Sequence, residues 1–323
     1  MEYEYFSLIK YIICENLCSS VVNKKMVWII GCNGMLGTQV CRTLEENKIE
    51  FTGTDSNVSI LDYKMLEDFA SGKEISCIVN CAAYTAVDKA ESDADFARAL
   101  NADGPRNIAR LAKKLGCPLI HISTDYVFDG TASSPISEST PVKPIGVYGN
   151  TKAEGEKAIS DETSDFYILR TAWLYGFSGK NFVYTMIRAM NSHDSVKVVS
   201  DQKGTPTNCE TLAGIITKII EKRLAGSSVT NGIYHVTDLG ETTWFDFTNE
   251  IKKQALEAGI LTNKDCVVNP CSTSEYPTPA KRPAYSVLDK SKIQKELGIA
   301  IPDWQAGLAK FINSPLFDKN RIQ

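Results

Sequence analysis

The sequence is short of the residues that several classes of protein require. Only three of its 323 residues are histidines, and two of these, His121 and His235, lie in apolar runs typical of buried strands. Little material is left for a histidine-based metal site or for a serine–histidine catalytic pair. Ten cysteines are present, but no two of them form a Cys-x-x-Cys pair. The sequence therefore predicts neither a zinc ribbon nor a redox dithiol.

Excess positive charge and long apolar runs are also missing. The net charge is −4 and the isoelectric point is about 5.6, which argues against a surface built to bind nucleic acid or an anionic membrane. The apolar run at residues 6–14 is interrupted by Lys10 and follows acidic residues. It fits neither a signal peptide nor a membrane span, which needs about 20 apolar residues. We therefore expect a cytoplasmic protein with reduced thiols and with no nucleic-acid or membrane partner. Residues 1–25 are expected to form an extension of unknown role, because a fresh strand-like run begins at Met26.

Near its start the chain contains a strand that runs into a glycine-rich turn. Residues 27–30 are apolar, the turn follows at residues 31–37, a helix is expected to about residue 47, and a second strand over 50–54 ends at Asp55. Glycines allow a tight turn and close approach to a pyrophosphate, whose charge the helix N-terminus meets. A carboxylate after the second strand can bond a ribose hydroxyl and repel a 2′-phosphate. The spacing is Gly-x-x-Gly-x-x-Gly, which differs from the commoner fingerprint. The sequence predicts a dinucleotide site that comprises Gly31, Asn33, Gly34, Met35, Leu36, Gly37 and Asp55.

Short apolar strands alternate with helices along most of the chain. Further strands are expected at residues 77–80, 120–122, 166–171 and 232–236, and helices at 93–115, from 147 onward and at 211–224. This alternation predicts an α/β fold built on a doubly wound parallel (Rossmann) sheet.

The rhythm changes beyond residue 176. A helix at 181–190, a short strand at 196–199, a loop at 201–207 and a helix ending near residue 258 predict a smaller, discontinuous C-terminal substrate-binding domain. We expect residues 26–173 and 198–238 to form the dinucleotide-binding domain and residues 174–197 and 239–316 the substrate-binding domain.

The segment that carries the chemistry spans residues 121–152. Thr124 stands at the end of a buried strand, a proline-rich loop follows, and Tyr148 and Lys152 lie four apart on the helix that begins near Val147. Side chains at this spacing share one helix face. A neighbouring ammonium lowers the pKa of a phenol, which is normally about 10. We therefore expect Lys152 to lower the pKa of Tyr148, and Thr124 to orient the same oxygen, as in an oxidoreductase acting on a carbonyl or an alcohol.

Together these features resemble the extended short-chain dehydrogenase/reductases, and within them the family of dTDP-4-dehydrorhamnose reductases. Besides the glycine turn, the stretches that carry the resemblance are residues 80–91, 123–130, 147–152, 170–173, 201–207 and 276–283, which extend almost to the C-terminus. The resemblance implies reduction of the 4-keto group of dTDP-4-dehydro-L-rhamnose to dTDP-L-rhamnose by NADPH or NADH. This is the last step in making an activated deoxysugar for cell-surface polysaccharide.

The resemblance also implies a role for each site residue. Tyr148 protonates the sugar oxygen, Lys152 holds the nicotinamide ribose and Thr124 bonds the reacting oxygen. The residues expected to border the adenine and the middle of the cofactor are Asp62, Tyr63, Cys81, Ala82, Ala83 and Tyr84. Those expected to face the nucleotide sugar are Val87, Thr124, Asp125, Tyr126, Trp173 and Arg282, with Arg282 at the diphosphate.

Some relatives are described as binding magnesium through glutamates, one of them just after the glycine turn. Here residues 37–40 carry no carboxylate, so no metal site is predicted, nor any dimer built on one. Both a monomer and a homodimer remain open.

Two alternatives on the same scaffold remain. A nucleotide-sugar dehydratase typically has Asp-Glu beside the threonine, whereas Thr124 is followed by Asp125 and Tyr126, and a 4-epimerase usually retains bound NAD⁺. A non-catalytic regulatory relative is the other alternative, although the set Thr124, Tyr148 and Lys152 is complete.

Overall fold

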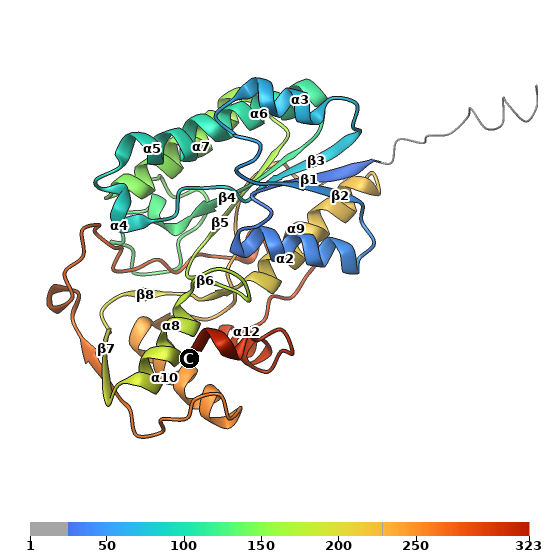
Figure 1. The fold of residues 1–323 in the computed structure, drawn as a ribbon. Coiled ribbons are helices and arrows are strands. Elements are labelled where there is room, and N and C mark those ends of the chain that lie inside the picture. Colours follow the sequence, from blue (N-terminus) through green and yellow to red (C-terminus); the bar gives the residue numbers. More distant parts are fainter. Residues whose placement is uncertain (1–24, 228, 323) are drawn as a thin grey trace, which may run out of the picture.

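The computed structural model describes residues 25–227 and 229–322, so all but the last residue of the predicted N-terminal extension lies outside the described residues. At the centre is a sheet of six parallel strands in the order β10-β5-β4-β3-β1-β2 (Figure 1). The strands are β1 (Met26–Ile30), β2 (Phe51–Thr54), β3 (Ile75–Asn80), β4 (Leu119–Thr124), β5 (Phe166–Thr171) and β10 (Gly232–His235). Most of their side chains are buried, as expected of parallel strands that are covered on both faces.

Helices cover both faces of this sheet (Figure 1). One face packs against α2 (Met35–Glu46) and α9 (Cys209–Leu224), and the other against α3 (Tyr63–Ala70), α6 (Gly104–Leu115) and α7 (Val147–Glu162). Side chains of successive residues in β1 lie on opposite faces of the sheet. Val27 and Ile29 pack on the side of α2 and α9, and Trp28 and Ile30 pack on the side of α3 and α6. The predicted doubly wound parallel fold is confirmed.

The stretch 93–115, predicted as one helix, consists of three pieces. They are α5 (Ala94–Arg98), the π-helical turn η1 (Ala99–Asp103) and α6, which ends at Gly116 in the left-handed conformation. A π-turn inside a helix often marks a functional position. Four helices were not expected from the sequence: α3, α4 (Val87–Ala90), α11 (Ser291–Leu297) and α12 (Trp304–Ile312).

Except for α9 and β10, the C-terminal half lies below the sheet in Figure 1 and has its own aromatic core. Its main helices are α8 (Phe182–Ser192), α10 (Trp244–Glu257) and α12. Short strands pair β6 (Leu174–Tyr175) with β9 (Thr207–Asn208), β8 (Lys203–Gly204) with β11 (Thr242–Thr243), and β7 (Ser195–Val199) with β12 (Val267–Cys271). The prediction of a plain loop over 201–207 was wrong, because β8 and the start of β9 lie there. Among the described residues no helix is long and apolar enough to cross a membrane.

The chain order in the sheet reverses between β1 and β3. From β1 the chain passes through α2 to the edge strand β2, and it then returns to β3 on the other side of β1. In doubly wound sheets, ligands bind in the crevice outside the carboxyl ends of the strands at such a switch point.

Candidate active site

The glycine turn lies at this switch point. Gly31 has φ +78°, and a Cβ there would lie 2.7 Å from the backbone nitrogen of Ala82, while a Cβ at Gly37 would lie 2.0 Å from the carbonyl oxygen of Gly31. The turn is therefore packed against the residues that follow β3. The N-cap of α2 is Gly34, which has no side chain to bond the free amides of the first turn. This cradle and the uncapped helix start fit the pyrophosphate of a dinucleotide.

Asp55 is held beside the turn. Its carboxylate accepts hydrogen bonds from the backbone nitrogens of Asn33 (3.2 Å) and Ser56 (2.8 Å). The acid at the end of β2 thus lies against the glycine turn.

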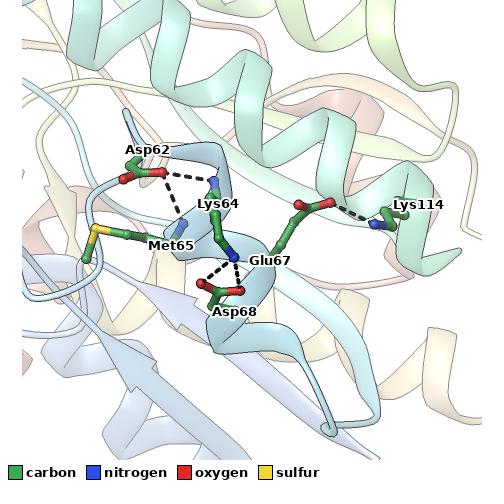
Figure 2. Close-up of polar contacts among 6 residues, drawn as sticks. All are labelled: Asp62, Lys64, Met65, Glu67, Asp68 and Lys114. Carbon is green, nitrogen blue, oxygen red and sulfur yellow. Dashed lines mark hydrogen bonds and ion pairs between the residues drawn. The ribbon is translucent and has the colours of Figure 1, made fainter.

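Asp62 and Tyr63 lie at the start of α3. Asp62 is the N-cap, and its Oδ1 accepts from the backbone nitrogens of Lys64 (2.9 Å) and Met65 (3.1 Å) (Figure 2). The ring of Tyr63 lies 4.5 Å from the guanidinium carbon of Arg110. Both side chains therefore have partners within the protein, and Asp62 is exposed.

The segment that follows β3 is clamped by Asn101 of the π-turn. Asn101 accepts from the backbone nitrogen of Tyr84 (2.9 Å) and donates to the Tyr84 carbonyl (3.1 Å) and to Oγ1 of Thr151 (3.1 Å). These bonds tie the small residues Cys81, Ala82 and Ala83 to helix α7. Asn101 is fully buried, and nothing in the sequence set it apart from its helical neighbours.

Thr124 and Tyr148 are brought together by the end of β4 and the first turn of α7. Thr124 donates to Oδ1 of Asp125 (3.0 Å) and accepts from the backbone nitrogen of Tyr126 (3.2 Å). The rings of Tyr126 and Tyr148 meet edge to face with centroids 5.4 Å apart. Asp125 is buried, and burial raises the pKa of its carboxyl to about 6. Hydrogen bonds from Ser286 and Thr124 lower this pKa but do not cancel the effect of burial.

Lys152 bonds groups of β4 and not Tyr148. Its Nζ donates to the carbonyl of Ile122 (2.6 Å) and lies 3.2 Å from Nε2 of His121. Burial raises the pKa of Tyr148 to about 12, Thr124 opposes this shift and Asp125 adds to it. The prediction that Lys152 lowers the pKa of Tyr148 was therefore wrong for this state of the protein. The physical reason is that the Lys152 side chain, only 1 % exposed, donates to a carbonyl of β4 and not to Tyr148.

A cleft of about 400 Å³ opens beside Tyr126, between the sheet and the C-terminal half. Its lining includes Phe182, Met186, Lys197, Gln202, Trp244, Tyr276, Thr278 and Arg282. Of the predicted substrate-side residues, Tyr126 and Arg282 line this cleft directly. The other lining residues lie in segments that the sequence analysis named as a helix, a strand or part of the family resemblance, but it assigned none of them to the site.

Trp173 is seated next to this cleft. It is one of two non-glycine residues with positive φ (+48°) among those described, and its ring stacks on Trp244 with centroids 3.6 Å apart. A Cβ at Gly204 would lie 2.6 Å from the Trp173 ring. The indole is thus held between a second aromatic and a bare backbone.

Arg282 is already paired in this structure. Its Nη1 and Nη2 bond the two carboxylate oxygens of Asp88 (3.1 and 2.8 Å), and Nη1 also bonds the carbonyl of Ala280 (3.2 Å). The Arg282 guanidinium accordingly holds the pKa of Asp88 below its usual value. Val87 begins α4, one residue before Asp88. This ion pair joins the segment after β3 to the C-terminal half across the cleft.

Comparison with known proteins identifies the family. The family model described as RmlD substrate binding domain matches residues 25–316. A curated dTDP-4-dehydrorhamnose reductase of Aggregatibacter actinomycetemcomitans is 39% identical over 282 residues, which cover 87% of this chain and 96% of the relative. The chain belongs to the dTDP-4-dehydrorhamnose reductase family. The family indicated by the sequence motifs is confirmed.

Solved structures of reductases in this family share the fold. One from Clostridium acetobutylicum has a TM-score of 0.82 at 40% identity and covers 89% of this chain and 98% of its own. One from Bacillus anthracis, in complex with NADP, has a TM-score of 0.82 at 35% identity with the same coverage.

The magnesium described for some family members finds no ligands here. Within residues 25–227 and 229–322, no three His, Cys, Asp or Glu side chains are grouped so that they could hold a metal ion. In the stretch after the glycine turn, Gln39 is buried and contacts Thr43 (3.4 Å). The residues present do not fit a metal, and no step of the chemistry is assigned to one.

Proposed function

We propose that the protein reduces the 4-keto group of dTDP-4-dehydro-L-rhamnose to give dTDP-L-rhamnose, with NADPH or NADH as reductant. One observation carries the proposal for a chain of this family: Tyr148 bonds Thr124 at the carboxyl end of β4, and its ring contacts Tyr126, which lines a cleft of about 400 Å³. The nicotinamide cofactor supplies hydride to carbon 4 of the sugar when it is bound.

Tyr148 is the proposed proton donor. Its raised pKa means that the phenol holds its proton at neutral pH, which suits a group that must give a proton to a developing alkoxide. Thr124, whose hydroxyl is held by Asp125 and by the backbone of Tyr126, is proposed to bond the same sugar oxygen. Lys152 is proposed to hold the nicotinamide ribose.

The remaining cofactor contacts follow from the cradle. We propose that the pyrophosphate lies against the start of α2 at residues 31–37, that Asp55 meets the adenosine ribose, and that Asp62 and Tyr63 border the adenine. Residues 81–84 would flank the middle of the cofactor. The close approach of Gly31 to Ala82 supports this placement, because it leaves backbone and not side chains at the surface of the crevice.

The nucleotide sugar is assigned to the cleft. Two cations, Lys197 and Arg282, line it and could meet the diphosphate, Arg282 by giving up part of its pairing with Asp88. Trp173 would contact the sugar with the edge of its ring, because Trp244 and Gly204 cover the ring faces. Val87, Asp125 and Tyr126 would complete the sugar side.

The division of labour proposed for the chain follows the same geometry. Residues 26–173 and 198–238 would hold the cofactor, and residues 174–197 and 239–316 the nucleotide sugar. We place the enzyme in the cytoplasm, as a monomer or a homodimer.

The test is NAD(P)H oxidation by the purified protein with dTDP-4-dehydro-L-rhamnose supplied. Tyr148→Phe should lower turnover at least about 100-fold and leave the affinity for NAD(P)H within a few-fold. A matched control is Tyr234→Phe, since the Tyr234 hydroxyl bonds only the Thr230 carbonyl, away from the site. No NAD(P)H oxidation by the wild type, or epimerisation of a UDP-hexose instead, would contradict the proposed function.

A further inference from the structure

His121 is a fully buried histidine that the reduction described above does not use. It lies in β4, with Asn80 of β3 on one side of its ring and Lys152 of α7 on the other. Nδ1 is 3.0 Å from Nδ2 of Asn80, and Nε2 is 3.2 Å from Nζ of Lys152. All three side chains are at most 1 % exposed, so water does not substitute for a missing partner.

The position of the ring proton follows from counting donors. The backbone nitrogen of Ala82 can only donate, and it bonds Oδ1 of Asn80 (3.0 Å). The amide nitrogen of Asn80 therefore faces Nδ1 of His121, which must accept. In a neutral imidazole the proton is then on Nε2, and it points at Lys152.

An ammonium at Lys152 has three donors and no acceptor. The Nε2 proton and an ammonium would oppose each other, whereas a neutral amine can accept this proton and still donate to the carbonyl of Ile122. Burial acts in the same direction, since it lowers the pKa of Lys152 to about 8 and that of His121 well below its usual value.

The other charged groups around Lys152 do not reverse the preference for its neutral amine. On its own helix, Glu156 raises the pKa of Lys152 but is paired with Arg170 of β5 (2.6 and 2.9 Å). Tyr148 keeps its proton, and Asp125 is bonded to Thr124.

We propose that His121 is a positioning residue that favours the uncharged form of Lys152, so that in alkaline solution cofactor binding must add a proton to Lys152. The inference rests on the proposed function, because it takes the ribose of NAD(P)H as the group that receives the Lys152 ammonium. The proton comes from solvent and stays on Lys152 while the cofactor is bound. The enzyme would thus bind cofactor and one proton together.

The tautomer can be measured directly on the wild-type protein. Nitrogen-15 NMR of the ring nitrogens at pH 9 should show His121 protonated on Nε2. His235 is an internal reference for the other tautomer, with the proton on Nδ1. Its Nδ1 faces the carbonyl of Ile136 (3.0 Å), which can only accept, and its Nε2 faces Arg170 (3.4 Å), which can only donate. A His121 proton found on Nδ1 at pH 9 would overturn the inference.

The coupling is tested by the pH dependence of NADH binding. With a pKa of about 8 in the empty enzyme and an ordinary value near 10.4 when bound, wild type should take up nearly one proton per NADH at pH 9 and almost none at pH 6.5. The dissociation constant should rise about tenfold from pH 7 to pH 9. Calorimetry in buffers of different ionisation enthalpy measures both quantities.

The decisive variant is His121→Gln, whose amide oxygen can accept from an ammonium at the position of Nε2. It should cut the proton uptake at pH 9 to less than about a third and flatten the rise of the dissociation constant to about threefold or less. The matched control His193→Gln, at an exposed histidine, should behave as wild type. Equal uptake in His121→Gln and wild type, or no uptake in wild type, would refute the role of His121. Failure of wild type to bind NAD(P)H at any pH would instead refute the proposed function.

Discussion

Helix α7 carries both Tyr148 and Lys152 and packs closely against the π-turn η1. This close packing predicts the effect of adding one methyl group to α7. A Cβ at Gly155 would lie 2.0 Å from the carbonyl oxygen of Asn101, whereas ordinary contact begins at 3.4 Å. To accept Gly155→Ala, the helix and the π-turn must separate by roughly 1 Å or more, because buried packing leaves no slack. Overpacking of this kind costs about 1–3 kcal/mol. A misplacement of about 1 Å at a catalytic group can also cost about 100-fold in rate.

Gly214 provides the matched control. It lies in α9, which like α7 has 16 residues, and a Cβ there would meet nothing within 4 Å. Gly214→Ala should stabilise the protein by about 0.5–1 kcal/mol, since alanine is the better helix former. The free energies of unfolding of the two variants should therefore differ by about 2 kcal/mol or more, and their melting temperatures by about 4 °C or more.

Thermal unfolding and steady-state turnover measure the two consequences separately. We expect Gly155→Ala to lose stability and at least about tenfold in turnover, while Gly214→Ala keeps wild-type turnover. If both variants gained stability alike, the close packing of α7 on η1 would be refuted. A stable Gly155→Ala variant with normal turnover would show that the helix can move without disturbing Tyr148.

Three further predictions concern the ligands. Asp55→Ala should shift the preference between cofactors toward NADPH by about tenfold, roughly 1.4 kcal/mol, because the carboxylate that repels a 2′-phosphate is gone; an unchanged ratio of kcat/KM values would speak against Asp55 at the ribose. Arg282→Ala should raise KM for the nucleotide sugar about 10- to 100-fold with little change in kcat. Asp88→Asn should lower this KM, because the guanidinium of Arg282 is then free to bind the diphosphate; a higher KM would show that Asp88 does not compete with the diphosphate for Arg282. Trp173→Ala should lower kcat about tenfold or more through a misplaced sugar, and normal kcat in this variant would leave Trp173 as packing alone.

The central sheet could be predicted from sequence because its strands are buried on both faces. Runs such as residues 27–30 and 166–169 are apolar without interruption, and this pattern sets a parallel strand apart from its surroundings. The glycine turn was equally visible, since close backbone contact at Gly31 and Gly37 tolerates no other residue. The C-terminal half was less visible because its short strands depend on distant partners, as where Gly204 of β8 pairs with Thr242 of β11.

The sequence supplied the proposed site residues, but it could not predict how their side chains are paired in the structure. Spacing alone shows that Tyr148 and Lys152 share a helix face, yet it says nothing of the carbonyl of Ile122 that draws the lysine away. The pairing of Arg282 with Asp88 was hidden for the same reason, because residues so far apart in the sequence carry no local signal of contact.

The proposed place of Trp173 at the sugar would constrain how the substrate range of this enzyme can change. Since the indole fills the space that a side chain at position 204 would need, glycine is enforced there for as long as residue 173 is a large aromatic. A mutation at 204 alone would push the indole off its stack with Trp244, and a mutation at 173 alone would leave a void beside that stack. New sugar specificities at this position would therefore require two substitutions. A smaller residue at position 173 would come first, and only then could a side chain be accommodated at position 204.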